Sequence, residues 1–246
     1  MNRREILKLS AAASFAAVAA SGRGNAAQSS SAGVPTLSAT RDVPLAVAVV
    51  VGKNANVMDF SGPWEVFQDT MVAGWNAMAF RLFMVSGNRD PVETTGGMRV
   101  LPAYAFGDAG MPRPDVIVMG AQGEHTPEKI AWIREASENA SVVMTVCTGA
   151  FLLAQTGLLD NLEATTHHEY FDAFAKQFPA VRLNRTARYV ENPGSKFCSA
   201  GGITSGIELA LRVVQRYFGD TAPAQTAFYM EYNRSATRPA QAYASK

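Results

Sequence analysis

The stretch from Val142 to Leu153, VVMTVCTGAFLL, decides the fold class of this chain. It starts with a β-branched, apolar run, passes through a Cys-Thr-Gly triplet and continues with apolar residues at helical spacing. The pattern predicts a buried strand over 141–146 that leads directly into a helix over 149–156, ended by a glycine. We therefore expect Cys147 at the tip of a strand-to-helix turn.

Short apolar runs and helical segments alternate along the rest of the chain. Three further runs predict strands that are covered on both faces, at 45–51, 80–85 and 116–119. Helices are predicted from near Gly62-Pro63 and over 127–139, 169–178 and 203–218. This alternation predicts an α/β fold with a mostly parallel sheet and right-handed crossovers.

The predicted turn gives Cys147 a specific chemical environment. A residue there is held in a strained conformation and points into the cleft beyond the strand ends, as in a nucleophile elbow. Unpaired amides and the positive end of the helix dipole are expected to lower the pKa of the thiol. A buried structural cysteine is the open alternative, because free cysteines are among the most buried residues.

Four other side chains are candidates for a place near this cysteine or for a reactive role. Asp59 follows the first strand and is expected on the same rim, where burial would raise its pKa towards the range useful for proton transfer. A helix cap or loop carboxylate is the alternative. Cys198 is expected inside a strand of the core, with a Cys147–Cys198 disulfide as the alternative. His167 and His168 lack the spacing of a helical metal site, so we expect no metal.

The N-terminal segment of the chain predicts export. Two arginines ahead of a weakly apolar, Ala-rich segment match a twin-arginine signal over 1–27, which is removed and leaves no membrane anchor. A flexible leader is predicted over 28–43, the globular domain over 44–235 and a tail over 236–246. The formal net charge of +1 shows no basic excess, so no nucleic-acid partner is expected.

Five short motifs, in order along the chain, resemble one known family. They are Asp59–Val66 (DFSGPWEV), Val146–Gly149 (VCTG), Gly157–Leu159 (GLL), Ala164–His167 (ATTH) and Gly201–Leu211 (GGITSGIELAL). Together they are similar to the ThiJ/PfpI superfamily of class I glutamine amidotransferase-like proteins, and within it to the isonitrile hydratase branch. The resemblance extends over about residues 45–233.

The resemblance implies a flavodoxin-like three-layer sandwich, usually a homodimer, that acts on a small molecule without a cofactor. The implied activity adds water to an isonitrile and gives an N-substituted formamide through a cysteine-bound thioimidate. Cys147 would be the nucleophile, Thr148 its positioning neighbour and amide donor, and Asp59 the acid–base group. The implied substrate or oxyanion positions are Gly62, Gly120, Ala121 and His167.

The chain departs from that branch at two positions. Ala121 stands where a second glycine is usual, and alanine keeps the amide but resists a positive φ. His168 stands where tryptophan is usual. Three other functions stay open: a glyoxalase- or amidase-like cysteine enzyme, an oxidation-sensitive protein, and a ligand-binding domain like those of AraC-type regulators. A regulator is the least expected of these, since the sequence retains Cys147 and runs only to Lys246, too short for a helix-turn-helix pair after the domain.

Overall fold

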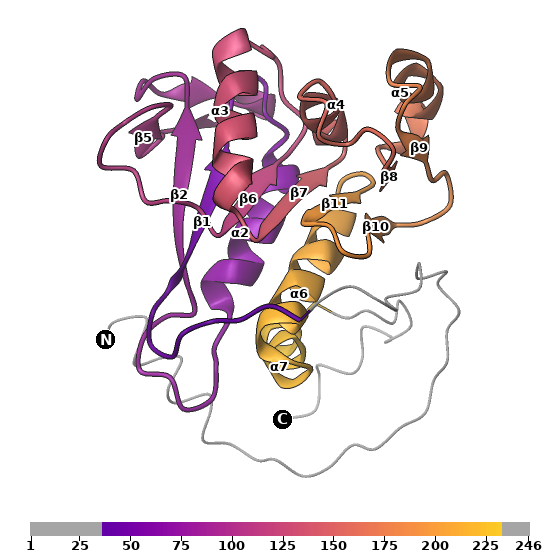
Figure 1. Cartoon of the computed structure of the whole chain (residues 1–246). Helices are drawn as coiled ribbons and strands as arrows, with labels where there is room; N and C mark the ends of the chain where they lie inside the picture. Colours follow the sequence, from indigo (N-terminus) through magenta and orange to yellow (C-terminus); the bar gives the residue numbers. More distant parts are fainter. Residues whose placement is uncertain (1–35, 233–246) are drawn as a thin grey trace.

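The computed structural model describes residues 36–232 (Figure 1). Two predicted segments lie outside the described residues, the signal over 1–27 and the tail over 236–246. The predicted leader over 28–43 lies partly inside them, and there the Leu37 amide donates a hydrogen bond of 2.8 Å to the Arg216 carbonyl. The part of the chain that packs on the domain therefore begins before the predicted boundary.

Seven strands form the central sheet, in the order β10-β11-β7-β6-β1-β2-β5. All neighbours are parallel except β10, which pairs antiparallel with β11. The bounds are Leu45–Val50 (β1), Phe80–Ser86 (β2), Tyr104–Ala105 (β5), Val116–Met119 (β6), Val142–Val146 (β7), Tyr189–Glu191 (β10) and Phe197–Ala200 (β11). Two small pairs lie apart from it, Val92–Glu93 (β3) with Arg99–Val100 (β4), and Glu163–Ala164 (β8) with Arg182–Leu183 (β9). The predicted mostly parallel sheet is confirmed.

Helices cover both faces of this sheet (Figure 1). One face packs against α2 (Val57–Asp69), α6 (Ser205–Phe218) and α7 (Thr221–Tyr229). The other face packs against α3 (Pro127–Asn139), α4 (Gly149–Ala154) and α5 (Phe171–Gln177). Short 3-10 turns are found at Thr95–Gly97 and His168–Tyr170. The result is the three-layer α/β sandwich that the resemblance implies.

Strand β1 shows why the central strands read as continuous apolar runs. Val47 and Val49 belong to the core on the α2 and α6 face, whereas Ala46 and Ala48 belong to the core on the α3 and α4 face. Side chains alternate between the two faces of a strand, so a strand covered on both faces needs an apolar residue at every position.

Helix α2 begins earlier than predicted. The Asn56 side chain caps it by accepting a hydrogen bond of 3.2 Å from the Met58 amide, and Pro63 lies inside the helix rather than in its first turn. The predicted start near Gly62-Pro63 is wrong because the asparagine cap, not the proline, decides where the helix begins. Asp59 therefore lies in the first turn of a helix that follows β1.

Several other boundaries differ from the prediction. Helix α4 ends at Ala154 rather than at 156, and α6 begins at Ser205 rather than at 203, although it ends at Gly219 as predicted. Cys198 lies in a strand, as expected. The strands of two or three residues were not predicted, because segments this short carry no periodic signal. Helix α7 was also not predicted, although it has nine residues.

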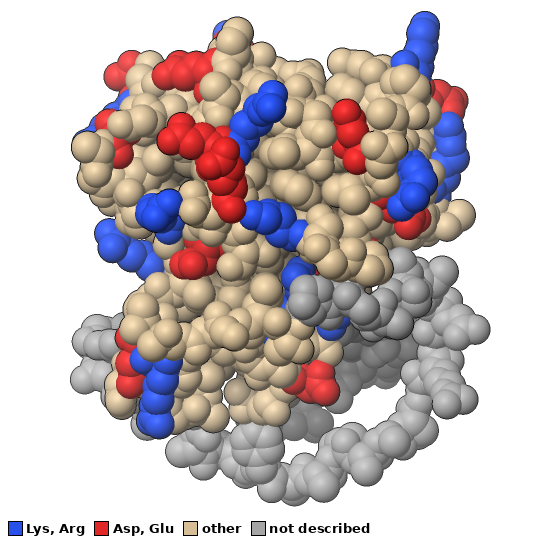
Figure 2. All heavy atoms as spheres, in the orientation of Figure 1, with Lys and Arg blue, Asp and Glu red and all other residues tan. Residues whose placement is uncertain are grey.

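Charges of both signs are mixed over the face drawn in Figure 2. Ion pairs between exposed side chains include Arg89 with Asp108, 2.7 Å apart, and Arg188 with Glu208, 2.8 Å apart. This mixture leaves no field of a single sign over that face. Among residues 36–232, no helix has both the length and the apolar character needed to cross a bilayer.

Candidate active site

Cys147 forms the sharp turn between β7 and α4. Its φ of 59° lies in the left-handed region, which residues other than glycine rarely adopt. Its amide donates to the carbonyls of Gly201 (2.7 Å) and Ala200 (3.1 Å), and its carbonyl accepts from the Thr166 hydroxyl (2.9 Å). These bonds hold the strained conformation that the sequence predicts for an elbow.

Gly149 allows the elbow to approach the neighbouring strand. A Cβ atom at this position would lie 2.2 Å from the Met119 carbonyl oxygen and 3.0 Å from that of Gly120. The first residue of α4 therefore packs directly on the backbone at the end of β6. A side chain there would push the elbow away from the Gly120 turn.

Asp59 reaches the elbow from α2 and is completely buried. Its Oδ2 accepts a hydrogen bond of 2.9 Å from the Ala121 amide, whereas its Oδ1 is buried without a hydrogen-bond partner. The Cys147 thiol lies close enough to the carboxyl group for each to shift the pKa of the other. A Cβ atom on Gly120 would lie 2.6 Å from the Asp59 Cβ, so glycine is what lets the carboxylate come this close. Three segments that are distant in sequence thus meet at one point.

Burial controls the protonation of this carboxyl group. Desolvation raises the pKa of Asp59 from its ordinary 3.8 to about 6, against the opposing effects of the hydrogen bonds from Ala121 and Cys147. The predicted direction of the shift is confirmed. Asp59 is therefore a carboxylate at neutral pH, yet it can hold a proton slightly below it.

The pKa of the Cys147 thiol shifts in the direction opposite to the prediction. Burial, followed by the negative charge of Asp59, raises the pKa of Cys147 to about 12, and the hydrogen bonds from Thr148 lower it too little to compensate. The expected fall in pKa is wrong because α4 is short and its start is closed to water. The resting pair is a neutral thiol beside a carboxylate, which can remove the thiol proton when an electrophile arrives.

Ala121 does not need the conformation that alanine resists. It is absent from the described residues with positive φ, and its amide is already bonded to Asp59. The amide that the resemblance assigns to an anionic intermediate therefore holds the carboxylate in this structure. The Gly120-Ala121 turn positions Asp59.

The remaining expected site residues have different surroundings. Gly62 is buried, and a Cβ atom there would lie 3.0 Å from the Ile207 side chain, so it serves the close approach of α2 to α6. His167 is half-buried, with its ring against Gly202 and stacked on His168 at a centroid distance of 4.5 Å.

Thr166 is the residue that the sequence analysis missed. It is buried, and its hydroxyl donates to the elbow carbonyl. It lies in the quoted ATTH motif, so the position was visible, but nothing local showed that the threonine rather than the following histidine touches the elbow.

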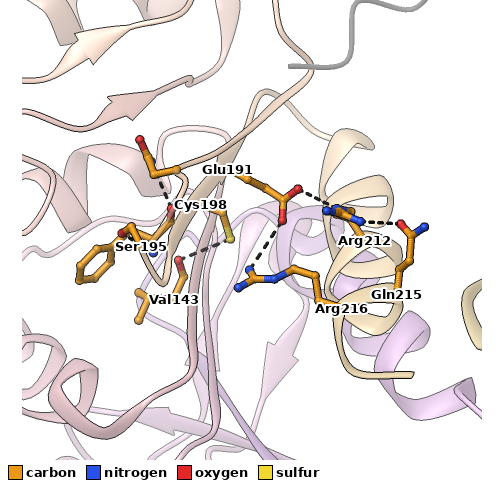
Figure 3. A network of polar contacts seen from close by, with 9 residues as sticks. Val143, Glu191, Ser195, Cys198, Arg212, Gln215 and Arg216 are labelled. Carbon is orange, nitrogen blue, oxygen red and sulfur yellow. Dashed lines mark hydrogen bonds and ion pairs between the residues drawn. The ribbon is translucent and has the colours of Figure 1, made fainter. Parts of the chain in front are cut away.

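Cys198 lies in the interior of β11, and both cysteines are free. Its Sγ lies 3.7 Å from the Val143 carbonyl oxygen, and complete burial raises the pKa of the thiol to about 12. Figure 3 shows it beside Glu191, which pairs with Arg212 at 2.7 Å and Arg216 at 3.6 Å. The alternative of a Cys147–Cys198 disulfide is wrong.

Two clefts of about 540 and 460 Å³ lie away from the elbow. The first is bordered by Gly52 and Lys53 after β1, Ser86 at the end of β2, and Thr126 and Lys129 at the start of α3. Neither cleft is lined by the cysteine or by the aspartate of the elbow. Within residues 36–232, no group of three or more His, Cys, Asp and Glu side chains is arranged to hold a metal ion.

Comparison with known proteins gives this geometry a context. The DJ-1/PfpI family model matches residues 46–216. A crystal structure of a ThiJ/PfpI family protein from Pseudomonas syringae superposes with a TM-score of 0.67 at 25% identity, covering 80% of this chain and 78% of that one.

Two curated relatives differ in what their names say. The isonitrile hydratase of Pseudomonas putida is 29% identical over 71% of this chain and 73% of its own length. The HTH-type transcriptional regulator CdhR of Pseudomonas aeruginosa is 30% identical over 62% of this chain, which spans only 45% of the regulator. The same domain is therefore found in an enzyme and in a regulator.

Proposed function

Because this chain belongs to the DJ-1/PfpI family, we propose that it is a cysteine-dependent enzyme that adds water to an isonitrile and releases an N-substituted formamide. The observation that carries the proposal is the contact between the Cys147 thiol and the buried Asp59 carboxylate at a strained elbow. The similarity to the isonitrile hydratase of Pseudomonas putida supports the choice of substrate.

The first step forms a bond between the Cys147 sulfur and the terminal carbon of the isonitrile. Asp59 accepts the thiol proton and delivers it to the same carbon, so that sulfur and hydrogen both end on it. The product is a thioimidate, R–N=CH–S–Cys147. A carboxyl group with a pKa of about 6 suits this step, because it can both accept and release a proton near neutral pH.

The second step hydrolyses the thioimidate. Asp59 takes a proton from water as the hydroxyl group adds to the carbon, and passes this proton to the nitrogen. The carbon–sulfur bond then breaks, the hydroxyl proton returns to sulfur, and R–NH–CHO leaves. The cysteine and the carboxylate are restored, and no oxidant or reductant is consumed.

The surroundings of the pair favour an apolar R group. Met58 adjoins Asp59 on α2 and is 41% exposed, and Ile203, close to the Gly201 carbonyl that holds the elbow, is 38% exposed. Exposed apolar side chains this near in sequence to residues of the site offer a surface for an alkyl or aryl group. Substrates with charged R groups are expected to react more slowly.

The test uses the purified protein with an alkyl isonitrile and, separately, with methylglyoxal, and detects products by mass spectrometry. Formamide is expected from the isonitrile, and the Asp59→Asn variant should lose about a hundredfold or more of this activity. Full activity in that variant would contradict the mechanism. Conversion of methylglyoxal alone would favour the glyoxalase-like alternative.

A second candidate is a ligand-binding domain that does not turn over its ligand. The specific observation in its favour is the 30% identity with the regulator CdhR, together with the high pKa of the thiol. Calorimetric titration with the same isonitrile separates the two: heat of binding without formamide formation would support the second candidate.

Export and assembly complete the proposal. The twin-arginine segment predicts a periplasmic enzyme, and fractionation of cells that carry the full chain fused to a reporter would test the location. The resemblance favours a homodimer, which light scattering of the purified protein measures directly.

A further inference from the structure

Lys129 is a buried ammonium group that the proposed reaction does not use. It lies in the first turn of α3, is only 3% exposed and borders the first cleft. Its Nζ donates to the Gln122 side-chain oxygen (3.1 Å) and to the Gly123 carbonyl (3.3 Å), and none of the described ion pairs includes it. Burying a charged group costs free energy, so the burial of this ammonium group calls for an explanation.

The Gln122 side chain connects Lys129 to the backbone at the ends of two strands. Its amide nitrogen donates to the carbonyls of Val50 at the end of β1 (3.1 Å) and Gly120 after β6 (3.3 Å). Its oxygen accepts from Lys129, so both ends of the side chain are engaged. A Cβ atom on Gly52 would lie 2.6 Å from the Lys129 Nζ and 2.8 Å from the Gln122 oxygen, so a side chain at this position would displace one or both of these groups.

The turn that Gln122 holds is the same turn that holds Asp59. The Ala121 amide donates to the Asp59 carboxylate (2.9 Å), and the Ala121 carbonyl accepts from the amide of Asn56, the cap of α2 (2.8 Å). A chain of hydrogen bonds therefore runs from Lys129 through Gln122 to the peptide group between Gly120 and Ala121, whose N–H donates to Asp59.

We propose that Lys129 is a positioning residue: through Gln122 it fixes the turn that aims the Ala121 amide at the Asp59 carboxylate. Its role in turnover rests on the proposed function, whereas its effect on the Asp59–Cys147 pair does not. Loss of the contact would leave the carboxylate with a weaker amide donor.

Lys129 could also act on Asp59 through its charge alone, and this effect must be distinguished from its effect on the orientation of the turn. Desolvation lowers the pKa of Lys129 and the charge of Glu124 opposes this, while Lys129 in turn lowers the pKa of His125. Other charged side chains on the cleft are Lys53, Asp90, Glu93 and Glu128. Removing Lys129 could act by loss of charge alone, so the variants must separate charge from orientation.

The experiment measures the alkylation rate of Cys147 by iodoacetamide against pH, with peptide mass spectrometry of the full chain. Ionised Asp59 is needed to take up the thiol proton, so the rate should rise through about pH 6 and then level off. In Lys129→Met and in Gln122→Met this midpoint should move up by about one pH unit, since the Ala121 bond that lowers the pKa of Asp59 is weakened. Lys53→Met removes an exposed charge from the same cleft and should leave the midpoint in place.

The outcomes are decisive in each direction. A shift in Lys129→Met without one in Gln122→Met would show a charge effect and overturn the positioning role, as would an equal shift in Lys53→Met. If Lys129→Met does not fold, Gln122→Met decides alone. Because alkylation needs no isonitrile, a protein that makes no formamide but shows the two shifts would refute the proposed function and keep this inference.

Discussion

The two cysteines, Cys147 and Cys198, lie at neighbouring strands of the sheet and can be compared directly. Cys147 follows β7 and Cys198 lies in β11, the strand paired with β7. Both are buried, at 6% and 2% exposure, and the pKa of each thiol is raised to about 12. Burial and pKa by themselves therefore do not distinguish a reactive cysteine from a structural one.

What distinguishes them is the backbone and the neighbour. Cys147 has a φ of 59° and contacts a carboxylate that can take its proton, whereas Cys198 has extended strand geometry and its Sγ faces a carbonyl oxygen. Reactivity in such a site comes from a base within reach rather than from a thiolate that exists at rest.

The largest expected effect separates the two cysteines by function. Cys147→Ala should lower formamide formation by about a thousandfold or more, because the nucleophile is lost. Cys198→Ala should keep the activity and lose about 2 kcal/mol of stability through the cavity that it leaves. Product analysis and urea unfolding of both variants check this, and equal losses of activity would break the comparison.

Chemical labelling sharpens the same contrast in the unmodified protein. Iodoacetamide should modify Cys147 about a hundredfold faster than Cys198, which becomes accessible only when the sheet opens. Peptide mass spectrometry over time measures both rates in one sample. Equal rates in the native protein would contradict the assignment of Cys198 to a closed core.

Breaking the elbow should act on one cysteine only. Gly149→Ala places a Cβ atom 2.2 Å from the Met119 carbonyl oxygen. It should lower the free energy of unfolding by about 3 kcal/mol and abolish formamide formation. Gly110→Ala is the matched control, because a Cβ atom there meets nothing within 4 Å. Denaturant unfolding compares the two, and a neutral Gly149→Ala would disprove the tight packing at the elbow.

The smallest expected effect concerns the carboxylate. The folded-state pKa of about 6 lies above the ordinary 3.8, so ionised Asp59 lowers the stability of the fold, and this penalty disappears as the pH falls below both values. Asp59→Asn should therefore raise the free energy of unfolding by about 2 kcal/mol near neutral pH and by much less at about pH 4.

A matched variant controls for the loss of one negative charge. Asp90→Asn alters an exposed side chain and should change the stability by less than about 0.5 kcal/mol at either pH. If both variants gained the same stability, net charge rather than burial of Asp59 would be the cause.

Much of the fold was open to prediction because the central strands are covered on both faces. The runs around Val47 and Ile117 are apolar at every position, the run around Met144 is apolar except at Thr145, and a glycine ends α6 where predicted. The edge strand β10 has three residues and β5 has two, so neither carries a periodic signal. The start of α2 was missed because Asn56 was not recognised as the cap.

The meeting of Cys147 and Asp59 and the raised pKa of Asp59 could be predicted, but the protonation of the thiol could not. Cys147 follows β7 and Asp59 follows β1, two parallel strands separated only by β6, and the ends of such strands share one rim. The direction of the thiol shift was wrong because it depends on how much water reaches the start of α4, and local sequence does not report this. The role of Ala121 was missed for the same kind of reason, since its amide meets a side chain 62 positions away in the chain.

The sequence by itself determined the alternation of the main strands and helices, the glycine and cysteine at the sharp turn, and the family to which the motifs point. Periodicity and turn residues act over a few neighbouring positions, so they can be read locally. Only the tertiary structure decided that the thiol is neutral at rest and that the two cysteines stay apart. It also decided that the buried Lys129 is linked by hydrogen bonds to the turn that binds the Asp59 carboxylate. Burial, distance and charge at one point are set by segments that meet only when the chain is folded.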